Sequence, residues 1–329
     1  MPPGTNKLQI ASTGSPQDYY FLMLPHMTML AFCAAVEPLR VANQAAGAEL
    51  YRWFTVTDDG KPIHCSNRIE INPDLALSDV PSSAFVFVCS GVRVQEVVQR
   101  STVTWLRRHA VHGGRTGSLC AGVFALADAG ILNKCAFTLH WENHPGFTEK
   151  YPLLQPSLRR YEIDAGVMTC GGGNAATDMM LEVIERDHGK ELALYIADMC
   201  IHSRSSHRDM QQKTAMSAAF GSRNPALITA LRYMHDNLEE DLRLGDIIDR
   251  VPISSRQLER LFKKHLGQSP MQFYTDLRVS RAHALLNDTN LSVREITIAS
   301  GFSSQSLMAK KFKIRFGVSP HNYQRTWIE

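Results

Sequence analysis

The sequence has 329 residues and lacks any apolar stretch long enough to cross a membrane. A membrane-spanning helix needs about 20 consecutive, mostly apolar residues, and no run in this chain approaches that length. The N-terminal segment up to Tyr20 contains a single lysine and no apolar core, so it does not resemble a secretory signal. These absences argue against a membrane or secreted protein. They predict a cytoplasmic one, with residues 1–18 as a flexible lead-in.

Cysteine is present, but not in the arrangements that disulfide frameworks or zinc fingers require. The seven cysteines are an odd number, and no pair has the spacing of a metal finger. Most of them lie beside apolar or small residues, which suits reduced thiols in a reducing compartment: Cys33, Cys89, Cys120, Cys170 and Cys200. The sequence therefore predicts no structural metal site, and nothing in it predicts a cofactor.

Net charge is small, at +3, but it is unevenly distributed along the chain. Residues 224–329 contain 15 Lys and Arg against 11 Asp and Glu, and residues 255–329 contain 12 against 5. Residues 1–223 are close to neutral, with 20 against 21. A chain of 329 residues favours two domains. A basic domain joined to a near-neutral one is typical of a protein that binds a polyanion with one half only.

The last third of the sequence contains an internal repeat, which is the strongest signal in the chain. The segment RQLERLFKKHLGQSP (256–270) aligns with SLMAKKFKIRFGVSP (306–320) at an offset of 50 residues. Upstream, VPIS (251–254) aligns with SGFS (300–303) at an offset of 49, so the second copy has one additional residue in its turn. We therefore expect two copies of one supersecondary unit.

The first copy predicts two helices, over 244–251 and 255–266, separated by a break at Pro252. The Ser254 hydroxyl is suited to accept a hydrogen bond from a free N–H of the second helix, and Gly267 is suited to end that helix in the left-handed conformation. Apolar residues at helical spacing form the inner face: Leu258, Leu261, Phe262 and Leu266. The outer face is mostly charged: Arg256, Glu259, Arg260 and Lys263.

The second copy predicts helices over 293–300 and 304–316, with a turn at Gly301-Phe302 and a cap at Ser303 or Ser304. Its inner face contains Met308, Phe312 and Phe316. Its outer face is polar and basic: Gln305, Ser306, Ala309, Lys310 and Lys313. One long helix over 270–288, which Ser269 caps and Pro270 begins, would hold the two copies at a fixed separation.

Two short helices joined by a tight turn, with a basic outer face on the second, suit the major groove of DNA. That groove is about 12 Å wide and admits one helix. Two such units on one chain would enter successive major grooves, roughly 34 Å apart on one face of the duplex. The alternative is a plain helical bundle whose basic face is only solvated. Because caps, turns and basic faces are all duplicated, the pattern favours binding to double-stranded DNA.

Here the sequence resembles the DNA-binding domain of the AraC/XylS family of bacterial transcription regulators, over residues 226–327. Two segments carry the resemblance: ISSRQLERLFKKHLGQSPMQFYTDLRVSRAHALL and VREITIASGFSSQSLMAKKFKIRFGVSPHNYQR. It implies that bases are contacted by Arg256, Glu259 and Arg260 in one unit and by Gln305, Ser306, Ala309 and Lys310 in the other. The sequence departs from the family pattern at packing positions, which puts the helix angle rather than the function in question: Ile248, Pro252, Thr297 and Met308.

The first two thirds of the chain, residues 19–203, alternate strand-like and helix-like segments. Apolar runs predict strands over 19–24, 53–57, 84–90 and 115–122, the last running into a turn. Helical patterns occur over 29–43, 93–113, 123–130 and 175–188, with Pro38 expected to kink the first or mark a false start. This alternation predicts an α/β sandwich with a mostly parallel sheet, of the flavodoxin-like kind.

Cys120, in GSLCAG, lies at a predicted strand-to-helix junction. This is the layout of a nucleophile elbow with cysteine in place of serine, and His140 in TLHWENHPGF is a candidate base. Three considerations argue against catalysis: the turn over 25–30 has no carboxylate, elbow cysteines often remain as pocket walls, and a DNA-binding domain needs a sensor. A cysteine hydrolase or amidase, and a thiol redox sensor, remain the alternatives.

This region resembles the PfpI-like, class I glutamine-amidotransferase-like domains, and more closely those fused to AraC-type domains. The segments that carry the resemblance are AVEPLRVAN, LCAGVFALADAGIL, TLHWEN and TCGGGNAATDMMLEVI. In the enzymes of that superfamily, Cys120 and His140 would match the nucleophile and its partner. For this chain the resemblance implies a ligand-sensing domain that forms homodimers. By the same resemblance, close relatives sense glycine betaine or carnitine, and others sense arginine.

We expect the ligand pocket at the carboxyl ends of the strands, where the elbow points. Its candidate walls are Met29, Cys120, His140, Trp141, Gly172, Gly173 and Asn174. N–H groups at the start of the helix after CGGGN would hold a carboxylate, and the Trp141 ring would face a cationic ammonium. A tight packing turn is an equally good interpretation of the glycines. The chain leaves the choice among amines and amino acids open.

The polar segment 204–225 is interpreted as the connector between a sensor domain over 19–203 and a DNA-binding domain over 226–329. A solvated surface helix is the alternative for this segment. The predicted mechanism is a population shift in which a metabolite favours a dimer geometry able to engage DNA and RNA polymerase. An activator of amine or amino-acid catabolism genes is the function that these features favour.

Overall fold

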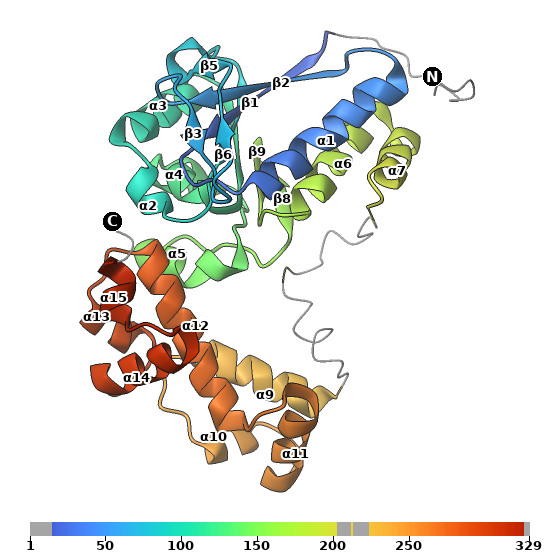
Figure 1. Ribbon diagram of the computed structural model, residues 1–329. Coiled ribbons are helices and arrows are strands. Elements are labelled where there is room, and N and C mark those ends of the chain that lie inside the picture. The colour runs from blue at the N-terminus through green and yellow to red at the C-terminus, as the bar shows by residue number, and fades with distance from the viewer. Residues whose placement is uncertain (1–14, 203–211, 213–223, 326–329) are drawn as a thin grey trace. The chain divides into compact units, whose positions relative to one another are not determined.

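The computed structural model describes residues 15–202, 212 and 224–325. The chain divides into two compact units, Met1–Gln212 and Lys213–Glu329, which are described separately (Figure 1). Most of the lead-in and most of the connector predicted from the sequence lie outside the described residues. Within the described ranges, no helix combines the length and the apolar character that crossing a membrane requires.

A seven-stranded sheet in the order β5-β2-β1-β6-β7-β9-β8 forms the centre of the first unit. Neighbouring strands are parallel, except that β9 and the edge strand β8 are antiparallel. The predicted α/β fold with a mostly parallel sheet is therefore confirmed. Its strands are β1 (Gln17–Met23), β2 (Tyr51–Thr57), β5 (Leu75–Ala76), β6 (Phe85–Cys89), β7 (Arg115–Leu119), β8 (Tyr161–Asp164) and β9 (Val167–Cys170), and a separate hairpin consists of β3 (Ile63–His64) and β4 (Glu70–Ile71).

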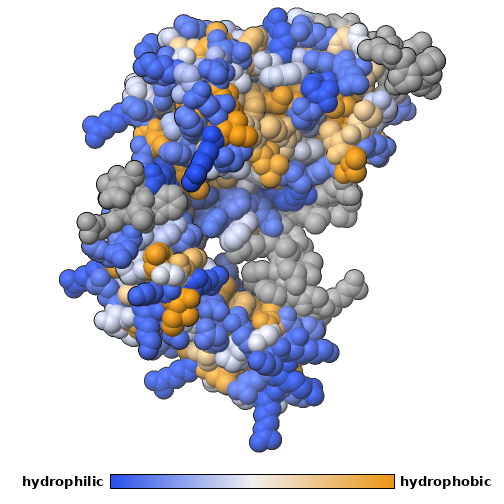
Figure 2. All heavy atoms as spheres, viewed as in Figure 1, coloured by the Kyte–Doolittle hydropathy of each residue, from blue (hydrophilic) through white to orange (hydrophobic). Residues whose placement is uncertain are grey.

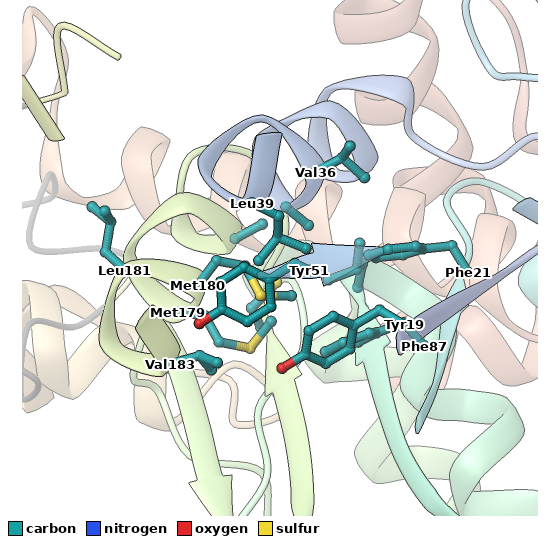
Figure 3. Packing of buried hydrophobic residues seen from close by; sticks show 14 of the residues in the cluster. Tyr19, Phe21, Val36, Leu39, Tyr51, Phe87, Met179, Met180, Leu181 and Val183 are labelled. Atoms are coloured by element: carbon teal, nitrogen blue, oxygen red, sulfur yellow. The ribbon is translucent and has the colours of Figure 1, made fainter. Parts of the chain in front are cut away.

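Helices cover both faces of this sheet (Figure 1). One core lies against α1 (Met29–Ala46), α6 (Ala175–His188) and α7 (Lys190–Met199). The other core contains residues of α3 (Arg100–Val111), α4 (Val123–Asp128) and α5 (His144–Lys150). Alternate residues of β1 belong to opposite cores, since Phe21 packs in the first and Leu22 in the second. Figure 3 shows the first core, in which Leu39 of α1 and Met180 of α6 pack with Tyr51.

Two details of the predicted helices in this unit are corrected by the structure. The helix expected over 93–113 consists of α2 (Val94–Val97) and α3, separated by extended backbone at Val98 and Gln99. Val97 and Val98 both pack against the second core, whereas consecutive residues of one helix point about 100° apart. Pro38 lies inside α1, which continues past it, so it does not mark a false start.

The second unit is all helical, as predicted, and contains two separate hydrophobic cores. The first core is formed around Leu258 and Phe262, and the second around Met308 and Phe312. The long helix α12 contributes to both, and it spans the predicted range. The helices of this unit are α9 (Pro225–Asp236), α10 (Leu244–Ile248), α11 (Ser255–Leu266), α12 (Pro270–Asp288), α13 (Val293–Ala299), α14 (Gln305–Phe316) and α15 (Pro320–Arg325).

The first helix of each pair is shorter than the sequence predicted. The helix expected over 244–251 ends at Ile248, and residues up to Val251 follow in tight turns. Pro252 explains the early end, because the residue before a proline is disfavoured in the helical conformation. In the second pair, α13 ends at Ala299 rather than Ser300.

Candidate DNA-binding surface and effector pocket

Local signals in the sequence fix where α11 begins and ends. The Ser254 hydroxyl accepts a hydrogen bond from the N–H of Gln257 at 3.4 Å, and the Gln257 side chain accepts one from the N–H of Ser254 at 3.0 Å. This reciprocal pair is a capping box. At the other end, Gly267 adopts the left-handed conformation, with φ of 72°. The predicted cap, bounds and terminator of this helix are therefore confirmed.

The outer face of α11 is exposed along its whole length. Leu258 and Phe262 are buried in the first core of this unit, which turns the opposite face to solvent. The four residues that the sequence assigned to DNA all lie on that exposed face: Arg256, Glu259, Arg260 and Lys263. The Lys263 ammonium donates to the carbonyl oxygen of Gly267 at 3.1 Å, so it also helps to cap the C-terminal end of the helix.

The second helix pair repeats this arrangement. Ser304 rather than Ser303 caps α14, and its hydroxyl accepts from the N–H of Leu307 at 3.3 Å. Gly317 ends the helix with φ of 78°. Met308 and Phe312 are buried, whereas Phe316 is half-buried. The outer face is exposed, apart from the half-buried Ala309: Gln305, Ser306, Ala309, Lys310 and Lys313. Figure 2 shows hydrophilic side chains over most of the visible face of the second unit.

In the first unit, Cys120 directly follows β7 and has the backbone of an elbow. Its φ is +59°, a conformation that non-glycine residues rarely adopt. Neighbouring backbone leaves little space, because a Cβ on Gly122 would lie 2.0 Å from the carbonyl oxygen of Val88. The residue is 8% exposed. The predicted strand-to-helix elbow is thus present at the carboxyl end of a central parallel strand, next to α4.

Two other segments pack closely around the Cys120 side chain. The Thr28 hydroxyl lies 3.9 Å from its sulfur. A Cβ on Gly172 would lie 3.0 Å from the Cys120 Cβ and 3.3 Å from its sulfur, and Gly172 has φ of +86°. Glycine at 172 is therefore required both by backbone conformation and by the close approach of this cysteine. Sequence reasoning named Gly172 for anion binding and missed Thr28.

The glycine loop precedes α6, but the first N–H groups of that helix are already occupied. Ala175 and Ala176 donate to the carbonyl oxygens of Gly172 and Gly173, both at 3.2 Å. They are not available to a carboxylate in this conformation. Asn174 precedes the helix without a side-chain cap. The packing-turn interpretation of the glycines therefore has direct geometric support at Gly172.

His140 directly precedes a short 3₁₀ helix, Trp141–Asn143, which Trp141 begins. Nδ1 of His140 accepts from the N–H of Glu142 at 3.4 Å, and the rings of His140 and Trp141 lie 5.4 Å apart between centroids. Trp141 is 41% exposed, an unusual value for so large an apolar ring. Met29 begins α1 and packs against the first core. Figure 2 shows hydrophobic residues gathered in several groups on the visible face of the first unit.

Gln212 is a site residue that sequence reasoning missed, because it lies in the segment interpreted as a connector. Its side-chain oxygen accepts from the N–H of Trp141 at 2.9 Å. Its side-chain nitrogen lies within hydrogen-bonding distance of Thr138 Oγ1 and of the carbonyl oxygens of Leu139 and Arg159. The same side chain fills the space beside Gly171, where a Cβ would lie 2.5 Å from it.

The remaining cysteines near the elbow are poorly suited to redox chemistry. Burial raises the pKa of the Cys170 thiol to about 12, and it raises the pKa of the Cys89 thiol well above its usual value. Thiols react as thiolates, so both are unreactive at neutral pH. In the part of the chain that the structure describes, no group of three or more His, Cys, Asp or Glu side chains is placed to hold a metal ion.

Two capped helix-turn-helix pairs in a basic unit, joined to an α/β unit, define the class of a DNA-binding transcription regulator. Comparison with known proteins agrees: residues 247–326 match a helix-turn-helix domain family, and residues 26–186 match the DJ-1/PfpI family. The chain is 39% identical to the HTH-type transcriptional regulator GbdR of Pseudomonas aeruginosa over 94% of this chain and 84% of that protein. It is 36% identical to CdhR of the same species, over 92% and 90% respectively. The chain therefore belongs to the AraC family of HTH-type transcriptional regulators.

Solved structures agree on the fold of the first unit. An AraC family transcriptional regulator from Pseudomonas putida superposes with a TM-score of 0.51 at 23% identity, over 56% of this chain and 100% of that one. A ThiJ/PfpI family protein from Pseudomonas syringae superposes with a TM-score of 0.52 at 18% identity, over 67% and 88%. These likenesses support the fold class predicted from the sequence. The similar proteins GbdR and CdhR are named as transcriptional regulators rather than as enzymes.

Proposed function

We propose that the second unit contacts DNA bases through the outer faces of α11 and α14. In α11 these contacts come from Arg256, Glu259 and Arg260, and in α14 from Gln305, Ser306, Ala309 and Lys310. Lys263 and Lys313, nearer the C-terminal ends of the two helices, contact backbone phosphates. The observation that carries this proposal is the repetition in one unit of a capped helix with an exposed, polar and basic face.

The first unit is proposed to bind a small amine or amino acid, such as glycine betaine, carnitine or arginine. Its pocket lies around the elbow and is lined by Met29, Cys120, His140, Trp141, Gly172, Gly173 and Asn174. Ligands of α/β folds bind outside the carboxyl ends of the strands, which is where Cys120 lies. The exposed Trp141 ring supplies a face for a cationic ammonium group.

In this proposal Cys120 is a wall of the pocket and not a nucleophile. Its strained backbone is the one observation that favours the alternative, a cysteine hydrolase or amidase. Against that alternative, the similar proteins GbdR and CdhR are named as transcriptional regulators and not as enzymes. A redox sensor that pairs Cys120 with Cys170 is disfavoured, because burial raises the pKa of the Cys170 thiol to about 12.

Ligand binding is proposed to reach the second unit through Gln212. The Gln212 amide is bonded to the Trp141 backbone and to the segments around Thr138 and Arg159, and the second unit follows along the chain. A ligand that moves Trp141 changes these bonds and shifts the population of DNA-binding arrangements. The active form is proposed to be a cytoplasmic homodimer that activates transcription by contacting RNA polymerase.

A thermal-shift screen of the full chain tests the effector. The panel contains glycine betaine, carnitine, choline and arginine, and a ligand at 100 times its Kd stabilises a protein by about 2.7 kcal/mol. We expect one compound to raise the unfolding temperature, Trp141→Phe to keep most of the response, and Trp141→Ala to lose it. A panel without any response, or a response that Trp141→Ala leaves unchanged, contradicts the proposed ligand class and pocket.

Replacement of Cys120 separates the sensor from the two alternatives. We expect Cys120→Ala to keep DNA binding and most ligand-dependent transcription in a reporter strain. Loss of both activities, with the fold intact by circular dichroism, contradicts the sensor assignment and favours chemistry at the thiol.

A further inference from the structure

The two helix-turn-helix pairs meet at a joint that contains a buried arginine. Arg278, in the middle of α12, is only 8% exposed. Its Nε donates to the carbonyl oxygen of Leu238 at 3.0 Å, and its Nη2 donates to the carbonyl oxygen of Glu240. Both acceptors belong to the loop between α9 and α10, which precedes the first pair and packs in its core. The forked guanidinium thus ties the connecting helix to that loop through two backbone carbonyl groups.

Aromatic rings from both cores of this unit lie beside the same guanidinium. Its central carbon is 4.4 Å from the ring centroid of Tyr274, which belongs to the first core, and 6.0 Å from that of Phe302, which belongs to the second. The Tyr274 hydroxyl lies 2.5 and 2.6 Å from the carbonyl oxygens of Asn237 and Glu240. Arg278 therefore contacts the loop between α9 and α10 and the turn of the second pair simultaneously.

The turn of the second pair also touches that loop directly. Gly301 has φ of +71°, and a Cβ at this position would lie 2.2 Å from the carbonyl oxygen of Leu238 and 3.0 Å from Nε of Arg278. Any side chain here would separate the turn from the loop. Both the conformation and the close approach therefore require glycine.

The place of this joint in the fold gives it a specific consequence. The two pairs have separate cores, with Tyr274 packed in the first and Val279 in the second, so Arg278 lies at the boundary between them. A connecting helix alone would hold the two helix pairs less rigidly than a connecting helix with additional contacts between the pairs. The loop between α9 and α10, the Arg278 guanidinium and the Gly301 turn provide these additional contacts.

We propose that Arg278 is a positioning residue that fixes the orientation of α11 relative to α14, and thereby the spacing of the two DNA boxes that one chain accepts. This inference rests on the proposal that both helices contact DNA. A rigid joint makes the second contact nearly intramolecular once the first has formed, which raises affinity only for duplexes with the matching spacing. A loose joint lowers affinity for that spacing and tolerates others.

The guanidinium shape, rather than its charge, is what the joint uses. Asp241 is the nearby carboxylate, but it is 3.8 Å away and its side chain is 89% exposed, so that ion pair contributes little. Lysine keeps the charge but has neither the fork for two carbonyl groups nor the flat face for two rings. Arg278→Lys is therefore the informative variant.

A matched control is available on the same helix. Arg281 pairs with Glu239 of the same loop at 2.5 Å, and the Glu239 side chain is 64% exposed. Arg281→Lys keeps charge at a contact between the same two segments. Arg281 is not among the contacts of the Gly301 turn: the three heavy atoms nearest to a Cβ at Gly301 belong to Leu238, Glu239 and Arg278. We therefore expect Arg281→Lys to behave like the wild-type chain.

The experiment measures binding of the full chain to the duplex that wild-type protein selects from a random library. Three probes are compared: the selected duplex, versions with one box scrambled, and a version with about five base pairs, half a helical turn, inserted between the boxes. We expect the insertion to weaken wild-type binding at least about tenfold. For Arg278→Lys we expect about tenfold weaker binding to the selected duplex, an insertion penalty below about threefold, and single-box binding within about twofold of wild type.

Three results would overturn the proposal. An Arg278→Lys chain that keeps the full insertion penalty contradicts the positioning role alone, and so does an Arg281→Lys chain that loses the penalty to the same extent. A wild-type chain that is indifferent to the insertion contradicts the two-helix contact as well. If Arg278→Lys does not fold by circular dichroism, Gly301→Ala opens the joint from the other side, and it must reduce the insertion penalty for the proposal to stand.

Discussion

The two units of this chain are built in opposite ways, and the difference determines what a sequence discloses about each. The second unit consists of local helix pairs, each with its own small core and its own caps. The first unit is organised by a sheet in which most neighbouring strands are far apart in the sequence, in the order β5-β2-β1-β6-β7-β9-β8. The surroundings of Cys120 are formed by long-range contacts, such as that of Thr28 with Cys120. A candidate site formed by local contacts can be recognised from the sequence, whereas one formed by long-range contacts cannot.

The two candidate sites differ in the same way. The proposed DNA-binding surface consists mostly of exposed side chains on two helices, so we expect single substitutions there to change binding without moving the backbone. The proposed pocket depends on backbone conformation at Cys120 and Gly172, which both have positive φ values and pack closely against each other. The four predictions that follow test this contrast, beginning with the largest expected effect.

Removal of a core ring should unfold only the unit that contains it. Phe262 is fully buried in the first core of the second unit, and phenylalanine-to-alanine changes in cores cost about 3–5 kcal/mol. We expect Phe262→Ala to lower the unfolding temperature of the second unit and to leave that of the first unit unchanged, as followed by calorimetry. Phe312→Ala is the matched change in the other core. A common shift of both transitions would contradict the independence of the units.

Loss of an arginine from α11 should weaken specific DNA binding without changing stability. We expect Arg256→Ala and Arg260→Ala each to cost about 1–3 kcal/mol against the selected duplex, because a bidentate contact to a base edge is lost. Arg232→Ala, an exposed arginine on α9, is the control and should have little effect. An unchanged footprint in both α11 variants would remove this helix from base recognition.

Alkaline pH should destabilise the first unit more than the second. The folded state keeps the Cys170 proton because burial raises its pKa to about 12, whereas the unfolded chain releases it near the ordinary pKa of 9.0. The unfolded state then binds fewer protons, so the free energy of unfolding falls above pH 9, by about 1.4 kcal/mol per pH unit for this thiol. Residues 213–329 contain no cysteine. Urea titrations of the full chain at pH 7 and 10 measure the free energy of unfolding of each unit. Cys170→Ala should reduce the loss of stability of the first unit between these pH values. An equal loss of stability in both units would refute the prediction.

Replacement of the helix caps should lower stability least, and by similar amounts in the two helix pairs. Ser254 and Ser304 each accept a backbone N–H at the start of the proposed DNA-contacting helix. Replacement of such a cap by alanine costs about 1 kcal/mol. We expect Ser254→Ala and Ser304→Ala to lower stability by similar amounts, measured by chemical denaturation. A cost at one site only would show that the two pairs are not equivalent in construction.

How much was predictable follows from the range of the interactions involved. The bounds of α11, α12 and α6 match the sequence predictions because their signals are local. Serine caps begin α11 and α12, a left-handed glycine ends α11, and apolar spacing indicates α6, which has no side-chain cap. The break between α2 and α3 was missed because it results from packing of Val97 and Val98 on a distant core. Hydrophobic periodicity records which face is buried, but not what lies beneath it.

The candidate site divides along the same line. The sequence placed the exposed residues of α11 and α14 and the elbow at Cys120, since each depends on a local pattern. It did not identify Gln212, whose partners are 53 to 74 positions away in the chain, or Arg278, whose acceptors are 38 to 40 positions away. Contacts of this kind leave no periodic trace in a single sequence.

The most direct test of the account is a selection of genomic fragments by the full chain, followed by footprinting. The account predicts enrichment of fragments with two boxes about one helical turn apart, 10 to 10.5 base pairs between centres for each chain. Protection of both boxes should be reduced to one in Lys310→Ala combined with Gln305→Ala. Fragments bound no better than random duplex, by a chain with both units folded, would contradict it.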